Sequence, residues 1–288
     1  HPLWKDTTVE LKGADGEPPI SNYRDGVFVE NKFYITILED APVCWILDFT
    51  QKLRWQKVPV LIDMDPNQFH PVKSTFGAAI KREIYLFGGE NRLTDLPTNS
   101  MYRLNICNMK LSKIPENETF PTPRSMHSLN PLGLHHLILF GGRCVTESGD
   151  SYDTKDFYIY DVYKNAWTSH ASTPNLPYPR SSHASTTLCG KLFIYGGQQI
   201  SSHSPSSSIH DDEDVWEYDF LKCGWRRYLT PMSPPFFLPE EWISTNMTTT
   251  EDPLEQMMIL YPARKMWVRA KVQGMPRLEC MAIKVDPR

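Results

Sequence analysis

Long apolar runs and an excess of basic residues are both missing from this 288-residue sequence. No stretch approaches the roughly 18–20 uninterrupted apolar residues of a membrane-spanning helix, so membrane insertion is not expected. The 30 Lys and Arg are outnumbered by 34 Asp and Glu, which gives a formal net charge of −4. A nucleic-acid-binding domain usually has a basic patch and an isoelectric point above about 9. Neither a membrane nor a nucleic acid is therefore an expected partner.

Paired and clustered cysteines are missing as well. The six cysteines are scattered singly, with no C-x-x-C pair and no clustered His to complete a zinc site. We expect all of them to be reduced, which favours a cytoplasmic protein and leaves a nuclear one open; they are Cys44, Cys107, Cys144, Cys189, Cys223 and Cys280. Two N-x-T sequons, at Asn117 and Asn246, keep a secreted location as an alternative.

Proline and glycine are too few for a disordered or collagen-like chain. The sequence has 24 Pro and 15 Gly, well under the roughly 25–30 % that marks low-complexity chains. Aromatic residues make up 12 %, which is enough to bury a large core. No segment shows a convincing 3.6-residue helical period, and short apolar or alternating strands occur throughout. These features predict an all-β fold in one domain, residues 1–288, with no linker.

A phrase of two apolar residues followed by two glycines occurs three times. The copies are Leu86-Phe87-Gly88-Gly89, Leu139-Phe140-Gly141-Gly142 and Ile194-Tyr195-Gly196-Gly197, whose first glycines lie 53 and 55 residues apart. The phrase Pro-Arg-Ser-x-His precedes two of them, at 123–127 and 179–183. An aromatic strand ending in Asp follows, and then a tryptophan, Trp167 or Trp225. Three features in one order at one period indicate an internal repeat.

This pattern resembles the kelch repeat, whose units of about 50 residues form the four-stranded blades of a β-propeller. The clearest repeats cover 76–226, and degenerate copies cover 18–55 and 242–268. In the first degenerate copy Thr36-Ile37 stand where the glycine pair is expected. Residues 1–12 and 274–288 match two halves of a blade split between the chain ends. The resemblance implies six blades of four antiparallel strands, with a five-bladed ring as the alternative.

Several residues in the repeat have a structural interpretation. A glycine pair permits positive φ and close backbone approach where the second strand ends. Tryptophans supply apolar contact between neighbouring blades. Because the Arg-x-x-His phrase recurs, we expect its histidines to form hydrogen bonds within their own blades rather than to catalyse a reaction. The expected structural residues are Gly88, Gly89, His127, Gly141, Gly142, Trp167, His183, Gly196, Gly197 and Trp225.

The loops after the glycine pairs and the arginines that begin each repeat are the candidate binding residues. Loops on a rigid scaffold usually determine binding specificity. The resemblance implies that the arginines lie near the axial opening, where they either hold blade loops together or bind a carboxylate. The loops and the arginines together predict one axial face that binds an acidic or phosphorylated segment of another protein. The residues are Arg24, Arg124, Ser125, Arg143, Arg180, Ser181, Gln198 and Arg277.

No motif predicts catalysis, and we assign no catalytic residue, metal or cofactor. His210-Asp211-Asp212-Glu213-Asp214 lacks the alternating spacing and turn glycine of a calcium loop. The resemblance implies a non-catalytic interaction module that acts as a scaffold or adaptor. The settings it implies are substrate capture for a ubiquitin ligase, cell polarity or small-GTPase regulation. A kelch-type enzyme or a secreted sugar-binding propeller is the alternative, and the oligomeric state is not predicted.

Overall fold

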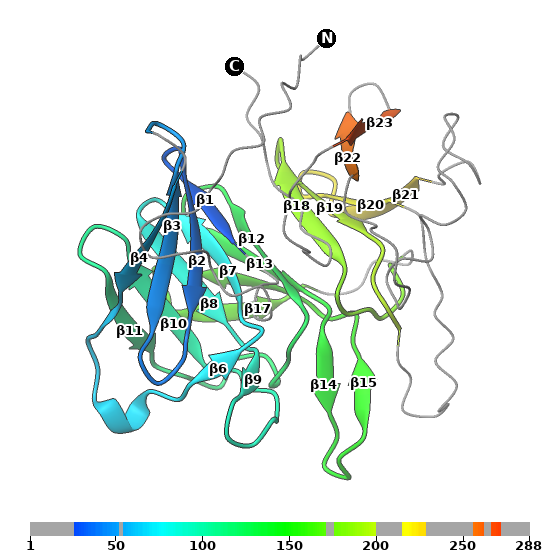
Figure 1. Ribbon diagram of the computed structural model, residues 1–288. Coiled ribbons are helices and arrows are strands. Elements are labelled where there is room, and N and C mark those ends of the chain that lie inside the picture. The colour runs from blue at the N-terminus through cyan, green and yellow to red at the C-terminus, as the bar shows by residue number, and fades with distance from the viewer. Residues whose placement is uncertain are drawn as a thin grey trace, which may run out of the picture.

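The computed structural model describes residues 26–51, 54–170, 176–199 and 215–228, together with the backbone of two strands at 256–261 and 266–271. Almost all of its regular structure is β-strand, arranged as separate antiparallel sheets (Figure 1). The predicted all-β propeller is confirmed. Four four-stranded blades lie within the described residues. Six blades, a single domain and the split closing blade remain predictions, because residues 1–12 and 274–288 lie outside the described residues.

Each blade is a meander of four strands in chain order. The first contains β1 (Val27–Val29), β2 (Lys32–Ile37), β3 (Val43–Asp48) and β4 (Trp55–Pro59). The second contains β7 (Phe76–Ile80), β8 (Glu83–Phe87), β10 (Met101–Asn105) and β11 (Lys110–Ile114). The third contains β12 (Ser128–Leu132), β13 (His136–Phe140), β16 (Phe157–Asp161) and β17 (Ala166–Ser169). The fourth contains β18 (Ala184–Leu188), β19 (Lys191–Tyr195), β20 (Val215–Asp219) and β21 (Gly224–Tyr228).

Shorter elements join or extend these blades. Strand β5 (Leu61–Ile62) runs parallel to β11 and adds a fifth strand to the second blade. A 3-10 turn, η2 (Pro66–Gln68), precedes β6 (Val72–Lys73), which pairs with β9 (Glu90–Asn91). Strands β14 (Arg143–Val145) and β15 (Ser151–Asp153) form a hairpin. Strands β22 (Gln256–Tyr261) and β23 (Met266–Lys271) pair antiparallel, at the place expected for the third and fourth strands of the next repeat.

The first strands of the blades define the propeller axis. Strand β7 contacts both β1 and β12, and β12 also contacts β18. The innermost strands of the four blades therefore follow one another around the axis, and the fourth strands lie at the periphery.

Aromatic side chains fill the seams between blades. The ring of Trp167 in the third blade lies 5.2 Å from that of Phe87 in the second. The ring of Trp225 in the fourth blade lies 5.4 Å from that of Phe140 in the third. All four side chains are buried, and such burial contributes about 25 cal/mol per Å² of apolar surface. Each phenylalanine directly precedes a glycine pair, so one strand end supplies both the apolar anchor and the turn.

The first blade departs from the sequence-based alignment by one residue. Lys32 lies opposite Asp48, as His136 lies opposite Asp161 in the third blade. Counting from these pairs, the glycine positions correspond to Ile37 and Leu38. The assignment of Thr36-Ile37 to them is therefore wrong by one residue, because β2 extends through Ile37 where the other blades turn.

Candidate functional site

One axial face is formed by the loops that follow the glycine pairs and by the segments that enter the innermost strands. We call it the loop face and define it by residues 71–75, 88–99, 122–127, 141–155, 178–183 and 196–199. Figure 1 shows β6, β9 and the β14–β15 hairpin at this end of the blades, with the hairpin extending outward. The face contains all the predicted partner-binding residues except Arg24 and Arg277, which lie outside the described residues.

The chain enters the second, third and fourth blades in the same way. An antiparallel bridge joins each entering segment to the residue after the glycine pair, and the bridged residues are Lys73–Glu90, Ser125–Arg143 and Ser181–Gln198. The following residue has a positive φ in each blade although it is not glycine, with values of 56°, 54° and 54° at Ser74, Met126 and Ser182. One backbone design therefore presents different side chains around the face.

The glycine pairs connect each blade to the next through the backbone. Gly141 and Gly142 have φ values of 64° and 105°. The Gly142 amide donates to the Arg180 carbonyl at 2.9 Å, and a Cβ on Gly141 would lie 2.6 Å from that same oxygen. Gly88 and Gly89 make the equivalent contacts with the Arg124 carbonyl. The third pair, Gly196 and Gly197, has the same backbone conformation, with φ values of 64° and 100°. A residue larger than glycine at Gly88 or Gly141 would therefore push the two adjoining blades apart.

Arg124 is fully buried, and its guanidinium binds groups of its own blade. Nη1 donates to the Gly141 carbonyl at 3.1 Å, and Nε donates to the Thr122 carbonyl at 3.0 Å. Nη2 reaches Asp156 Oδ2 at 2.9 Å and Thr122 Oγ1 at 2.8 Å. Every guanidinium nitrogen of Arg124 therefore has a partner within the chain.

Arg180 repeats this arrangement in the fourth blade. Its Nη1 donates to the Gly196 carbonyl at 2.8 Å and its Nε donates to the Tyr178 carbonyl at 3.2 Å. The side chain is only 3 % exposed. The sequence left open whether these arginines hold blade loops together or bind a partner. Their burial favours the first role, because a buried guanidinium cannot meet a ligand without giving up existing bonds.

The two predicted serines also connect blades. The Ser125 hydroxyl donates to Glu90 of the preceding blade at 3.0 Å, and Ser181 accepts from Arg143 Nη2 at 2.9 Å. Arg143 Nε also pairs with Asp153 at 3.0 Å. In the fourth blade, Gln198 stands at the position that Arg143 has in the third, and its backbone forms hydrogen bonds with that of Ser181. Sequence reasoning missed the acidic groups Glu90, Asp153 and Asp156, although Glu90 directly follows a glycine pair.

The two histidines lie between blades, and the prediction that each bonds within its own blade is wrong. His183 Nε2 lies 2.9 Å from the hydroxyl of Ser128 in the third blade. His127 has no hydrogen-bond partner among the described residues, because Phe76 stands where Ser128 would be, with ring centroids 5.2 Å apart. Burial, with a smaller effect of Arg180, lowers the pKa of His183 to about 3. Burial also lowers the pKa of His127 well below its usual range.

The loop face retains exposed apolar side chains. Leu93 and Leu96, in the loop after the first glycine pair, are 81 % and 55 % exposed, and Tyr178 is 58 % exposed. Asp95 and Asp156 are 73 % and 42 % exposed. Leu93, Leu96, Tyr178 and the β14–β15 hairpin are therefore among the groups of this face that a partner can reach without breaking a contact between blades.

Other chemistry is sparse in the described part of the chain. Five cysteines there have free thiols, and Cys280 lies outside it. No group of three or more His, Cys, Asp or Glu side chains within those residues could hold a metal ion, and the acidic run His210–Asp214 falls outside them. No helix in the same residues is long and apolar enough to cross a membrane.

Comparison with known proteins agrees with this geometry. Residues 74–277, more than two thirds of the chain, match the family described as the KLHDC2/KLHL20/DRC7 Kelch-repeats domain. The chain is 28 % identical to Kelch domain-containing protein 3 of Bos taurus over 153 residues, covering 51 % of the chain and 37 % of that protein. It is 31 % identical to the Rho GTPase-activating protein gacHH of Dictyostelium discoideum over 147 residues, covering 50 % and 10 %.

A longer match joins the chain to the Leucine-zipper-like transcriptional regulator 1 homolog of Drosophila melanogaster. The two are 26 % identical over 245 residues, which cover 75 % of this chain and 23 % of that protein. The chain therefore spans much less than two thirds of the length of these relatives. The repeated blade entrances, the glycine pairs and the family match lead to one conclusion: this chain belongs to the kelch-repeat family.

Proposed function

We propose that this propeller is a non-catalytic protein-interaction module that binds a partner through its loop face. Kelch propellers generally bind other proteins, and the described chain presents such a surface. The observation that carries the proposal is the contrast within the loop face. Its backbone is fixed by repeated bridges and buried arginines, whereas Leu93, Leu96 and Tyr178 are exposed on it. Exposed apolar and aromatic side chains on a rigid frame are typical of interfaces.

The sequence predicts a partner segment that is acidic or phosphorylated. We retain this as part of the proposal. Arg124 and Arg180 are no longer proposed as the donors to the partner, because both are buried and bonded within the chain. Arg143, already paired with Asp153 and Ser181, also serves the scaffold first. A cationic contact to the partner must therefore come from groups elsewhere on the loop face.

The biological setting is proposed by analogy. One relative has Rho GTPase-activating in its name, which supports small-GTPase regulation among the settings that the resemblance implies. Capture of a substrate for a ubiquitin ligase and cell-polarity scaffolding are the other two. We propose a cytoplasmic location. In its support, the five cysteines of the described residues have free thiols, as a reducing compartment would keep them.

The test compares the two axial faces. The double variant Leu93→Asp/Tyr178→Asp alters exposed side chains of the loop face. The matched control, Leu134→Asp/Tyr163→Asp, alters a leucine 60 % exposed and a tyrosine 69 % exposed in turns at the other end of the strands. Each immobilised protein would capture partners from a cell extract, quantified by mass spectrometry. We expect the first variant to lose the proteins that the unmodified chain enriches, and the control to keep them.

Both variants must retain the melting temperature of the unmodified chain, because all four positions are exposed. Loss of the captured proteins from the control variant alone would contradict the assignment of the loop face. Equal enrichment by all three proteins would contradict it as well.

A further inference from the structure

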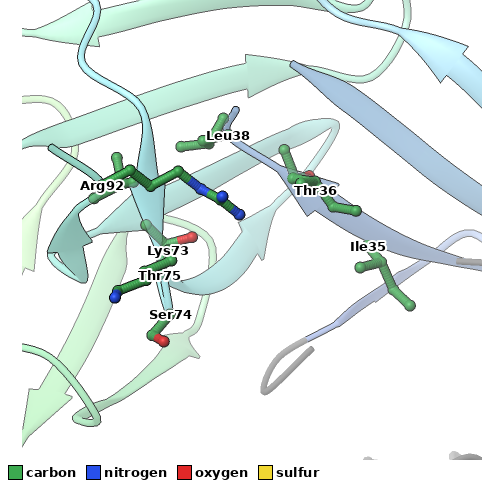
Figure 2. A pocket seen from close by; sticks show the side chains of 9 residues that line it. Ile35, Thr36, Leu38, Lys73, Ser74, Thr75 and Arg92 are labelled. Carbon is green, nitrogen blue, oxygen red and sulfur yellow. The ribbon is translucent and has the colours of Figure 1, made fainter. Parts of the chain in front are cut away.

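A small cavity opens on the loop face between the first and second blades. It is lined by residues 35–38 at the end of β2, by residues 72–75 at the entrance to β7, and by Arg92. Figure 2 shows the Arg92 side chain reaching over this space toward Leu38 and Thr36. The other two described seams each contain a glycine pair, whereas the first blade has Ile37 and Leu38 at those positions. The cavity thus lies at the seam where Ile37 and Leu38 replace the glycine pair.

The size of the cavity restricts its occupant. Its volume is about 20 Å³, and a single water molecule needs about 10–15 Å³ measured in this way. A small-molecule pocket usually has a volume of about 300–1,000 Å³. The cavity therefore admits the terminal group of one side chain, such as a carboxylate, and not a whole metabolite.

The wall of the cavity offers mainly hydrogen-bond donors. Arg92 Nη2 is held by Glu39 Oε1 at 2.7 Å. Arg92 Nε, on the same edge of the guanidinium, is buried and has no partner among the described residues. Three residues that carry hydroxyls, Thr36, Ser74 and Thr75, also line the cavity, and the Thr36 hydroxyl lies 3.9 Å from Cys44 Sγ. An N–H that is buried without an acceptor is costly, so an incoming oxygen at this point gains more than an ordinary surface contact would.

The nearby carboxylates orient the cations from outside the lining. Glu39 is 45 % exposed. Lys73 pairs with Asp95 at 2.5 Å and with Glu90 at 3.7 Å, and these two side chains are 73 % and 20 % exposed. Solvent screens the charges of Glu39 and Asp95, and Glu90 already accepts from the Ser125 hydroxyl and pairs with Lys73. An oxygen inside the cavity would be sheltered from solvent. No carboxylate is among the residues that line the cavity.

We propose that this cavity receives the side-chain carboxylate of an Asp or Glu of the bound partner, with Arg92 Nε as its main donor. The inference rests on the proposed function, because it names the charged contact of the same face. It also explains how the face can recognise an acidic segment although Arg124 and Arg180 are buried.

The test uses small probes and so does not need the partner. N-acetyl-glutamate N-methylamide is titrated into the isotope-labelled chain and followed by NMR, with the glutamine analogue as the uncharged probe. We expect saturable shifts at Thr36, Ser74 and Thr75 with the glutamate probe only. Arg92→Gln should weaken the binding about tenfold or more, since a charged hydrogen bond is worth roughly 1.5–3 kcal/mol. The control is Arg82→Gln, because Arg82 pairs with Glu30 at 2.8 Å in a turn at the other end of the strands.

Equal shifts with both probes, or unchanged binding by Arg92→Gln, would overturn the inference. Inorganic phosphate that binds this site more tightly than the glutamate probe would overturn the choice of a carboxylate. These results are independent of the capture experiment with Leu93 and Tyr178. Failure of the cavity proposal therefore leaves the loop-face proposal standing, and failure of the capture experiment leaves the probe result unchanged.

Discussion

Single residues in equivalent positions have different chemistry in neighbouring blades. His127 and His183 occupy the same place in their repeats, but one packs against Phe76 and the other forms a hydrogen bond with Ser128. A buried, uncharged imidazole is compatible with both environments. The sequence identified the repeated histidine, but its partner is set by the neighbouring blade, which repeat alignment does not reveal.

The buried histidines predict a loss of stability in acid. The folded-state pKa of His183 is about 3, below its ordinary value of 6.5, so the folded chain holds the neutral form while the unfolded chain takes up a proton. Stability is complete above pH 6.5 and is lost as the pH falls from there toward 3. His183 alone should cost about 2 kcal/mol between pH 6.5 and 4.5. Urea unfolding at several pH values measures this slope.

His183→Asn should flatten that slope more than His136→Asn does, because the His136 side chain is 43 % exposed. An unaltered slope in His183→Asn would show that other groups cause the acid sensitivity.

Replacement of Arg124 should be costly because of what it leaves behind. Arg124→Ala removes the donors for the carbonyls of Gly141 and Thr122 in a buried position. We expect a loss of about 2–4 kcal/mol in the free energy of unfolding. Arg82→Ala, at a side chain 61 % exposed, should change it by about 0.5 kcal/mol or less. Chemical denaturation of both variants measures the two losses in the free energy of unfolding. Equal losses would contradict a structural role for Arg124.

Two glycines separate backbone strain from blade packing. Gly133 and Gly141 have φ values of 63° and 64°, but an added Cβ on Gly133 meets no atom within 4 Å in the described structure. Gly133→Ala should therefore cost only the strain of the left-handed conformation, about 1–2 kcal/mol. Gly141→Ala adds a collision with the Arg180 carbonyl and should cost several kcal/mol. Similar losses in the two variants would show that the seam adapts.

At the scale of the element, sequence predicted what recurs and missed what does not. The glycine pairs and Trp167 recur with the repeat, and their spacing predicted strand ends and seams. The charge at an equivalent loop position does not recur, since Glu90 and Arg143 share one position with opposite charges. The positive φ of Ser74 could not be predicted, because a serine in the sequence does not indicate a left-handed backbone conformation. The candidate site could therefore be located on its face from sequence, but the bonded and the accessible side chains could not be distinguished.

The β14–β15 hairpin is expected to serve binding more than stability. Its tip is held by its own bonds, with the Thr146 amide donating to the Asp150 carbonyl and the Gly149 amide to the Thr146 carbonyl. Replacing residues 146–150 with Asn-Gly should keep the melting temperature within a few degrees, because a two-residue turn can close the hairpin. Under the proposed function the shortened chain should capture less partner. Full capture would place the contact elsewhere on the loop face.

At the scale of the whole molecule, the sequence predicts that the ring closes through the two chain ends. These ends lie outside the described residues. Trp4 and the segment 277–285 carry the pattern of one split blade. If they pair, removing residues 1–12 deletes the strand that joins the first blade to the last. We expect the shortened chain, residues 13–288, to melt well below the intact one, because an open ring exposes unpaired strand edges. Equal melting temperatures would contradict the split blade.

The serine hydroxyls between the blades have a consequence for how this face can change. A hydroxyl both donates and accepts, so Ser125 bonds to an acid and Ser181 bonds to a base through one and the same backbone arrangement. The neighbouring side chain can thus reverse its charge without disturbing the frame. Over the course of evolution, substitutions can therefore change the charge of one loop independently of the others, while the backbone of the ring stays the same.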